Sequence, residues 1–313
     1  MINSIFFLPI SVFENEKSLV KNFVKIKTIS SHKIINCIKS FLDKNHFLIF
    51  ITPYFKKSPP KNKAGKVYLC RLVPYMKKLV IIPTYNEKEN IENIISAVFA
   101  LEEVFHILVV DDSSPDGTAE IVKNLQKNYP EKLHLTIRKT KDGLGKAYLH
   151  GFKWALENNY DYIFEMDADF SHNPNDLPKL YEACRNADMS IGSRYSRGVN
   201  VVNWPITRVL LSYFASKYVR TILGIPVHDT TAGFVCFSRK VLEEIGLDKI
   251  KLKGYGFQIE MKFRAFKKGF KIVEVPIIFT NREFGESKMN GGIIHEAVFG
   301  VLNLKWKSII GKL

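Results

Sequence analysis

Short apolar runs alternate with amphipathic stretches between residues 77 and 166. The runs predict strands, and the stretches with apolar residues three and four positions apart predict helices. Repeated strand–helix–strand units with short connections predict an α/β fold, in which helices cover both faces of a mostly parallel sheet. The expected strands are 79–83, 107–111, 133–138 and 162–166, and the expected helices are 90–100, 118–128 and 146–158.

Polar residues follow three of the expected strands, in "PTYNE" (83–87), "VVDDSSPDGT" (109–118) and "MDADFSHNP" (166–174). Ligands of parallel sheets bind beyond the carboxyl ends of the strands, so these stretches are candidate binding segments. The second stretch also suits a turn and a helix cap, with Asp116 capping the helix. Such a cap leaves Asp111 and Asp112, at the end of a buried strand, without an explanation.

The third stretch contains Asp167 and Asp169 with one alanine between them. Neighbouring carboxylates stay ionised together only where a cation lies between them or water reaches both. Their hard oxygens suit Mg²⁺ or Mn²⁺, and Mg²⁺ takes substrate phosphates as further ligands. The alternative is a capping pair on a strand-to-helix loop. Because no G-x-G-x-x-G or Walker-type motif follows a strand, the pair indicates a metal site for a phosphorylated ligand rather than a dinucleotide fold or a Walker-type nucleotidase.

The composition changes near residue 75. Residues 1–75 hold 13 Lys and Arg against three Asp and Glu, whereas the remaining chain holds 33 against 28. We expect 1–75 to be a basic extension, disordered or weakly structured, with "KKSPPKNKAGK" (56–66) as a turn-forming stretch. The catalytic domain is expected at 76–313, beginning at Met76. The extension is either a membrane or targeting arm, or a segment translated from upstream of the true start that contributes no fold.

The formal charge of +15 lies mainly in that extension, so we expect no nucleic-acid partner. The four cysteines are scattered and form no C-x-x-C pair, which fits reduced thiols in the cytosol rather than a disulfide framework or a zinc site. No uninterrupted apolar stretch reaches the roughly 18 residues of a membrane-spanning helix.

Six motifs together resemble those of the family-2 glycosyltransferases of GT-A fold, and are most similar to the dolichyl- and polyprenyl-phosphate mannosyltransferases. They are "PTYNEKENI", "VVDDSSPDGT", "GLGKAYLHGFKWA", "MDADFSHNP", "GSRY" and "NREFGESKM". The resemblance covers residues 76–313. It implies transfer of mannose from GDP-mannose to polyprenyl or dolichyl phosphate, with inversion, by a peripheral protein on the cytosolic face of a membrane.

The resemblance also assigns residues by motif. The guanosine pocket is expected to contain Pro83, Tyr85, Glu87, Val110 and Asp112. The diphosphate and metal motif is expected to be Asp167, Ala168 and Asp169, with Asp167 and Asp169 as ligands of Mg²⁺ or Mn²⁺. The phosphate-holding cations are expected to be Arg194, Arg282 and Lys288. Some relatives have a metal-binding Gln where Ser171 stands, so that contact is expected to be lost or water-mediated. Asp229 is expected to border the acceptor, and Gln258 and Glu260 to lie near the sugar.

The chemistry of the implied reaction agrees with these roles. A metal can neutralise the charge that develops on the departing diphosphate without a protonating acid. The acceptor phosphate has a second pKa near about 6, so it is already an ionised nucleophile at neutral pH. Cations are then needed to bring two phosphorylated substrates together, with Asp167, Asp169 and Arg194 as the expected catalytic residues.

Segments 204–224 and 291–313 place apolar residues at helical spacing among Lys and Arg. Each is interpreted either as a basic interfacial helix on a membrane or as a helix that packs on the core. The protein is then either a peripheral single-subunit enzyme or one held by small membrane subunits. Alternative functions are a transferase of the same fold that uses UDP-glucose or another sugar nucleotide, and a non-catalytic subunit that binds nucleotide sugars.

Overall fold

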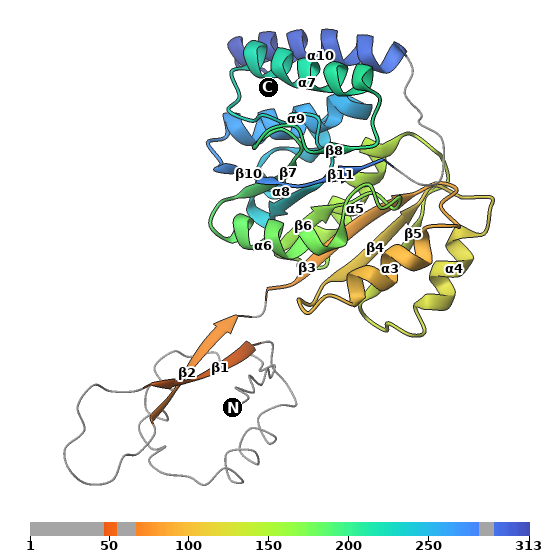
Figure 1. The fold of residues 1–313 in the computed structure, drawn as a ribbon, viewed down its shortest axis with the longest axis vertical. Helices are drawn as coiled ribbons and strands as arrows, with labels where there is room; N and C mark the ends of the chain where they lie inside the picture. Colours follow the sequence, from red (N-terminus) through yellow and green to blue (C-terminus); the bar gives the residue numbers. More distant parts are fainter. Residues whose placement is uncertain (1–46, 55–66, 75, 282–290) are drawn as a thin grey trace, which may run out of the picture. The chain divides into compact units, whose positions relative to one another are not determined.

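The computed structural model describes residues 47–54, 67–74, 76–281 and 291–313, and the chain divides into two compact units, Met1–Met76 and Lys77–Leu313 (Figure 1). In the first unit β1 (Phe47–Tyr54) pairs antiparallel with β2 (Val67–Pro74), from Phe47 opposite Pro74 to Tyr54 opposite Val67. The stretch 56–66 lies outside the described residues. The assignment of 1–75 to a non-catalytic extension stays a prediction.

The second unit is built on one seven-stranded sheet in the order β10-β7-β9-β6-β3-β4-β5. The strands are β3 (Lys78–Thr84), β4 (His106–Asp111), β5 (Leu133–Ile137), β6 (Tyr162–Glu165), β7 (Met189–Ser193), β9 (Val235–Ser238) and β10 (Ile272–Pro276). All neighbours pair in parallel except β9, which runs antiparallel to β6 and β7. A mostly parallel sheet was expected, and the α/β fold class is confirmed.

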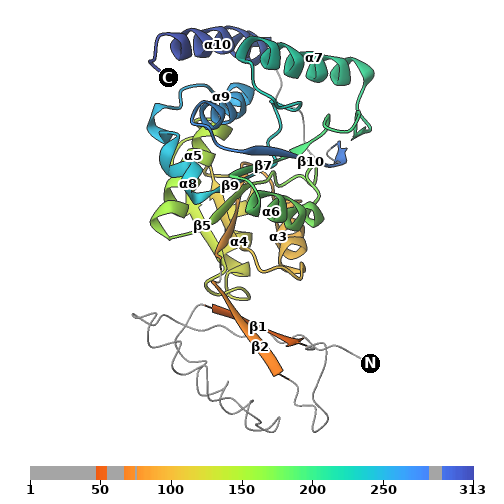
Figure 2. The same ribbon diagram turned by 90° about the vertical axis from the view of Figure 1, so that its left-hand side faces the viewer.

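Helices cover both faces of this sheet (Figures 1 and 2). One face carries α3 (Ile91–Phe99), α4 (Thr118–Leu125) and α6 (Leu177–Arg185), the last preceded by the 3₁₀ helix η2 (Pro174–Asp176). The other face carries α5 (Leu144–Glu157), α8 (Arg239–Glu244) and α9 (Gly254–Lys267), with the 3₁₀ helix η3 (Leu247–Lys249) between the last two. The helices expected at 90–100, 118–128 and 146–158 are therefore confirmed, with ends that differ by at most three residues.

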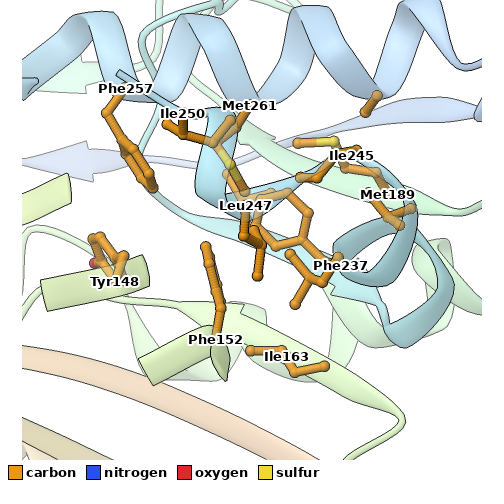
Figure 3. Close-up of a cluster of buried hydrophobic side chains, with 14 of the residues drawn as sticks. Tyr148, Phe152, Ile163, Met189, Phe237, Ile245, Leu247, Ile250, Phe257 and Met261 are labelled. Carbon is orange, nitrogen blue, oxygen red and sulfur yellow. The ribbon is translucent and has the colours of Figure 1, made fainter. Parts of the chain in front are cut away.

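The two faces follow from the alternation of side chains along the strands. On β3, Leu79 and Ile81 face the cluster formed with α5 and α9, whereas Val80 and Ile82 face the cluster formed with α3 and α6. Figure 3 shows the first cluster, where aromatic rings of α5 lie against residues of α9 and the segment before it. A Cβ on Gly151 of α5 would lie 2.8 Å from a carbon of Ile81, so this helix packs closely on the sheet only because a glycine stands there.

Two long helices lie at the end of the unit that is drawn at the top of both views (Figures 1 and 2). These are α7 (Ile206–Leu223) and α10 (Gly291–Ile309), and α10 contacts both α7 and α9. A short parallel pair, β8 (Val201–Val202) and β11 (Phe279–Thr280), lies in the segments next to them. Among the described helices, none combines the length and apolar content needed to cross a membrane.

Candidate functional site

The candidate site lies at one edge of the sheet, where the parallel strands β3, β4, β6 and β7 all end. The segments after three of these strands each contain a non-glycine residue in the left-handed region: Asn86, Ser113 and Phe170, with φ of 59°, 54° and 58°. Such residues cost about 1–3 kcal/mol each and persist where surrounding structure holds them, most often at binding and active sites. All three predicted motifs "PTYNE", "DDSSPDGT" and "DAD" therefore leave the sheet through a constrained turn.

The segments expected to form the guanosine pocket, 83–87 and 110–112, come together because β3 pairs with β4. Pro83 stands opposite Val110 in the ladder, and the backbone N–H of Asp112 donates to the carbonyl of Thr84 at 3.0 Å. Tyr85 is half-buried, and the Lys141 ammonium lies 3.4 Å from the centroid of its ring. The structure thus places expected guanosine-pocket residues side by side at the ends of neighbouring strands.

The two adjacent aspartates after β4 have different surroundings. Asp111 is fully buried and accepts hydrogen bonds from Thr84 Oγ1 (2.9 Å), Ser114 Oγ (2.6 Å) and the Ser114 N–H (2.9 Å). It fixes the turn and has a structural explanation that sequence reasoning did not supply. Asp112 instead forms an ion pair with Arg138, whose Nη1 lies 2.9 Å from Oδ1. Burial raises the pKa of Asp112, and the charge of Arg138 opposes part of that rise.

Other motif residues in this region also have defined contacts. Asp116 Oδ1 accepts hydrogen bonds from the N–H and the hydroxyl of Thr118, the first residue of α4, although the N-cap position itself is Gly117. Glu87 accepts a hydrogen bond from Asn90 Nδ2 at 3.1 Å at the start of α3. Asp116 and Glu87 thereby fix the first turns of α4 and α3, the helices that follow β4 and β3.

Asp167 and Asp169 follow β6 directly. The Tyr148 hydroxyl donates to Asp167 Oδ1 at 3.3 Å, and the Ser171 N–H donates to Asp169 Oδ1 at 3.1 Å. Asp169 is buried, whereas about a third of the Asp167 side chain is exposed. The two carboxylates therefore place hard oxygen atoms directly after the carboxyl end of β6. Such oxygens are a donor set that suits Mg²⁺ or Mn²⁺.

His172 stabilises the turn that contains Asp167 and Asp169. Its Nδ1 accepts a hydrogen bond from the Asp167 N–H at 3.2 Å, and its ring stacks on Phe234 with centroids 4.8 Å apart. Burial lowers the pKa of His172, although the charges of Asp167 and Asp169 oppose the shift. A neutral imidazole fits the acceptor role of Nδ1.

In the part of the chain that the structure describes, His, Cys, Asp and Glu side chains form no group of three or more able to hold a metal. A metal on the two aspartates would need further oxygen ligands from a diphosphate or water.

Arg194 follows β7 and is paired with Asp229. Nε and Nη2 of Arg194 lie 2.7 and 2.6 Å from the two carboxylate oxygens, and the Arg194 N–H donates to Asp229 Oδ2 at 2.9 Å. Burial is the largest single influence and works against both charges, but each partner's charge and the hydrogen bonds between them together outweigh it, so the pKa of Arg194 is raised and that of Asp229 is lowered. Sequence reasoning treated the two as separate candidates, and the structure makes them one buried ion pair.

A cavity of about 220 Å³ opens beside this ion pair. Its walls come from Arg194, Trp204, the inner side of α7, Tyr255 and Ile259 of α9, and Val298 of α10. Arg208 of α7 also lines it and stacks on Trp204, with 4.0 Å between the guanidinium carbon and the ring centroid. The cavity is thus apolar for most of its surface, and two arginines, Arg194 and Arg208, are among its lining residues.

Some sequence expectations fall elsewhere. Arg282 and Lys288 lie outside the described residues, so their phosphate-binding role stays a prediction. Gln258 and Glu260, expected near the sugar, are buried and bonded within the protein. Glu260 accepts hydrogen bonds from the backbone N–H groups of Lys251 and Leu252, both at 3.0 Å, and pairs with Arg264. Its visible role is therefore to fix the loop before α9.

Comparison with known proteins connects this geometry to a family. The family model described as "Glycosyl transferase family 2" matches residues 79–246, which include β3 to β9 and the aspartate pair. The chain belongs to glycosyltransferase family 2. The resemblance inferred from the motifs is confirmed, and the protein is a glycosyltransferase.

Relatives of this glycosyltransferase carry more specific names. A protein of Mycolicibacterium smegmatis named "Polyprenol monophosphomannose synthase" is 49% identical over 229 residues, which cover 73% of this chain and 86% of the relative. The "Undecaprenyl-phosphate mannosyltransferase" of Micrococcus luteus is 47% identical over 242 residues, covering 76% of this chain and 99% of the relative.

A solved structure supports the fold. The glucosyl-3-phosphoglycerate synthase of Mycobacterium tuberculosis, in complex with Mn²⁺, UDP-glucose and phosphoglyceric acid, superposes with a TM-score of 0.54. Sequence identity is 17%, and the match covers 74% of this chain and 80% of the other. The expected GT-A fold of the glycosyltransferase is confirmed.

Sequence reasoning missed three groups near the site: the half-buried Trp204 and the buried Glu165 and Lys262. Lys262 stands in "FQIEMKFRAF", where a lysine among apolar residues on a helix was a signal of a buried cation. Trp204 precedes α7 and was considered only as the start of an apolar segment. Glu165 lies within the expected strand 162–166, where no local pattern distinguishes it.

Proposed function

We propose that the protein transfers mannose from GDP-mannose to a polyprenyl or dolichyl phosphate, with inversion, on the cytosolic face of a membrane. The observation that carries the proposal is the meeting of two features at one sheet edge. The aspartate pair suits a metal–diphosphate, and the Arg194–Asp229 pair borders an apolar cavity suited to a lipid phosphate. The names of the two bacterial relatives support the same sugar and acceptor class.

On the donor side, Pro83, Tyr85, Glu87, Val110 and Asp112 would hold the guanosine. Asp167 and Asp169, with Ala168 between them, would hold Mg²⁺ or Mn²⁺, and the bound metal would supply the positive charge that stabilises the departing GDP. Tyr148 and the Ser171 N–H orient the two carboxylates. No protonating acid is required in this scheme.

On the acceptor side, Arg194 would bind the phosphate. Its Nη2 also donates to Thr231 Oγ1 at 2.9 Å, so the guanidinium plane is fixed before substrate arrives. Arg208, whose guanidinium also lies over the Trp204 ring, would add a second positive charge to the same cavity. Arg282 and Lys288 are proposed to complete this group of cations. A phosphate that is already ionised attacks the anomeric carbon without a general base.

The exposed face of α7 supports peripheral membrane contact. Ile206 and Phe214 expose 68% and 56% of their surface, and Lys217 and Arg220 are exposed on the same helix. An apolar stripe with basic neighbours suits an anionic bilayer surface. Either this surface alone or small membrane subunits would hold the protein there, and the catalytic unit is proposed to be 76–313.

A panel of radiolabelled sugar nucleotides, incubated with polyprenyl phosphate in lipid vesicles, tests the proposal. We expect GDP-mannose to be the preferred donor and the lipid product to be polyprenyl-phosphate mannose. The rate should fall on the acid side near the phosphate pKa of about 6, as the acceptor becomes a monoanion. The matched control is the polyprenyl alcohol, which lacks the ionised nucleophile and should accept nothing. A preference for UDP-glucose would reject the donor assignment, and transfer to the alcohol would reject the acceptor chemistry.

A further inference from the structure

A buried lysine behind the site connects its two halves. Lys262 of α9 is completely buried, and its ammonium donates to the Ala232 carbonyl at 2.7 Å and to Gln258 Oε1 at 3.1 Å. The amide nitrogen of Gln258 donates to Glu165 Oε2 at 2.8 Å. The Gln258 side chain thus bridges a buried ammonium and a buried carboxylate. We call Glu165, Gln258, Lys262 and the Ala232 carbonyl the buried bridge.

Burying the ionisable groups of the bridge costs free energy. Burial raises the pKa of Glu165 and lowers that of Lys262, because both groups lose water around their charged forms. Glu165 Oε1 has no hydrogen-bond partner among the described residues. Replacing such buried pairs with apolar residues is often neutral or stabilising by about 1–4 kcal/mol. Stability is therefore a poor reason for these residues to be here.

The location of its ends gives a better reason. Glu165 is the last residue of β6 and precedes Asp167 by two positions. Asp229 and Thr231 both accept hydrogen bonds from the Arg194 guanidinium. Ala232 directly follows Thr231 in the same loop. One continuous series of hydrogen bonds therefore runs from the strand of the aspartate pair, through α9, to the loop that holds Arg194.

We propose that Lys262 and Gln258 are positioning residues that fix the separation between the Asp167–Asp169 pair and Arg194. They act through other residues, by holding the donor-side strand and the acceptor-side loop on one rigid helix. Transfer needs the attacking phosphate oxygen within about 3–3.5 Å of the anomeric carbon, and a 1 Å misplacement can cost about 100-fold in rate. This inference rests on the proposed function, since it assigns the donor to one end of the bridge and the acceptor to the other.

Lys262→Met tests the bridge, because methionine approximates the length of lysine but removes its charge and donors. We expect kcat at saturating substrates to fall by about 10-fold or more, while the KM for the sugar nucleotide and the Kd for GDP with metal stay within about twofold. Gln258→Met cuts the bridge at its centre without removing a charge and should lower kcat in the same way. It also keeps the test decisive if Lys262→Met fails to fold.

The matched control is Arg264→Met. Arg264 is a buried cation of the same helix, and its Nε lies 2.9 Å from Glu260 Oε1, but its contacts lead to the loop before α9 rather than to Ala232. We expect it to lower Tm at least as much as Lys262→Met while leaving kcat within about twofold of wild type. A folded Lys262→Met or Gln258→Met with wild-type kcat would overturn the proposal, as would an equal loss of kcat in Arg264→Met.

The same assays separate this proposal from the proposed function. All variants are compared using the sugar nucleotide and lipid phosphate that the wild-type protein turns over fastest. If that donor is not GDP-mannose, the donor assignment fails, and the comparison of Lys262→Met with Arg264→Met still decides the bridge. If the donor is GDP-mannose and the bridge variants keep wild-type kcat, the positioning role alone fails.

Discussion

At the residue scale, the sequence identified the groups with distinctive chemistry but not their partners. Asp167 and Asp169 follow a strand that the apolar pattern predicted, so their position at a strand end could be inferred from periodicity. Arg194 was assigned only through the resemblance of "GSRY" to a family motif. The pairing of Arg194 with Asp229 joins residues 35 positions apart, and no local pattern encodes it. Lys262 was missed for a related reason, since its burial depends on Ala232 and Gln258 lying around it.

The aspartate pair gives a prediction at this scale. Asp169→Asn removes one charge from a hard-cation site and should abolish sugar transfer. The fold should remain intact, because the amide oxygen can still accept the hydrogen bond from the Ser171 N–H and the repulsion with Asp167 is relieved. Activity with added Mg²⁺ or Mn²⁺ and thermal unfolding would be measured together. Asp248→Asn, at a carboxylate with 85% of its side chain exposed, is the control. Near-wild-type turnover of Asp169→Asn in EDTA would reject the metal role.

At the scale of elements, helical spacing predicted helices in 204–224 and 291–313, where α7 and α10 lie, but left the role of their apolar residues open. The structure shows which of these apolar side chains are buried and which are exposed. On α10, Val301 and Leu304 are buried, while Phe299, Leu302 and Trp306 expose 57%, 45% and 62% of their surface. Periodicity shows that one face of a helix is apolar, but only the packing of neighbouring elements determines whether that face is covered.

The exposed face of α7 gives the prediction for this scale. Ile206→Asp places a charge in the apolar stripe, outside the lining of the cavity, and should weaken binding to anionic vesicles by about tenfold or more, because an exposed aliphatic side chain is lost and an anion is added. Co-sedimentation with vesicles measures binding, and transfer to a short-chain, water-soluble polyprenyl phosphate measures the site. Val104→Asp is the control, at an apolar side chain with 40% exposure in the loop before β4. Unchanged vesicle binding by Ile206→Asp would reject α7 as the membrane-contacting surface.

At the scale of the whole molecule, alternating strands and helices predicted a parallel α/β unit, and the strands expected between residues 79 and 166 all formed. The strand order did not follow from the pattern. Neither did the antiparallel insertion of β9 between β6 and β7, because pairing between distant strands leaves no local signal. That insertion matters for the site, because the loop before β9 carries Asp229 and Ala232 to the edge where β6 and β7 end.

The division of the chain gives the last prediction. A protein beginning at Met76 should fold and transfer sugar at a rate within about twofold of the full chain, since every motif of the site and both hydrophobic clusters of the second unit lie beyond that residue. Circular dichroism and thermal unfolding test the fold, and the donor assay tests activity.

Vesicle co-sedimentation separates the two interpretations of the extension. Weaker binding with unchanged transfer to a water-soluble acceptor would identify residues 1–75 as a basic membrane arm. Unchanged binding would leave the extension outside both fold and targeting. Loss of folded protein would show that the catalytic unit depends on residues 1–75 and that its boundary at Met76 is wrong.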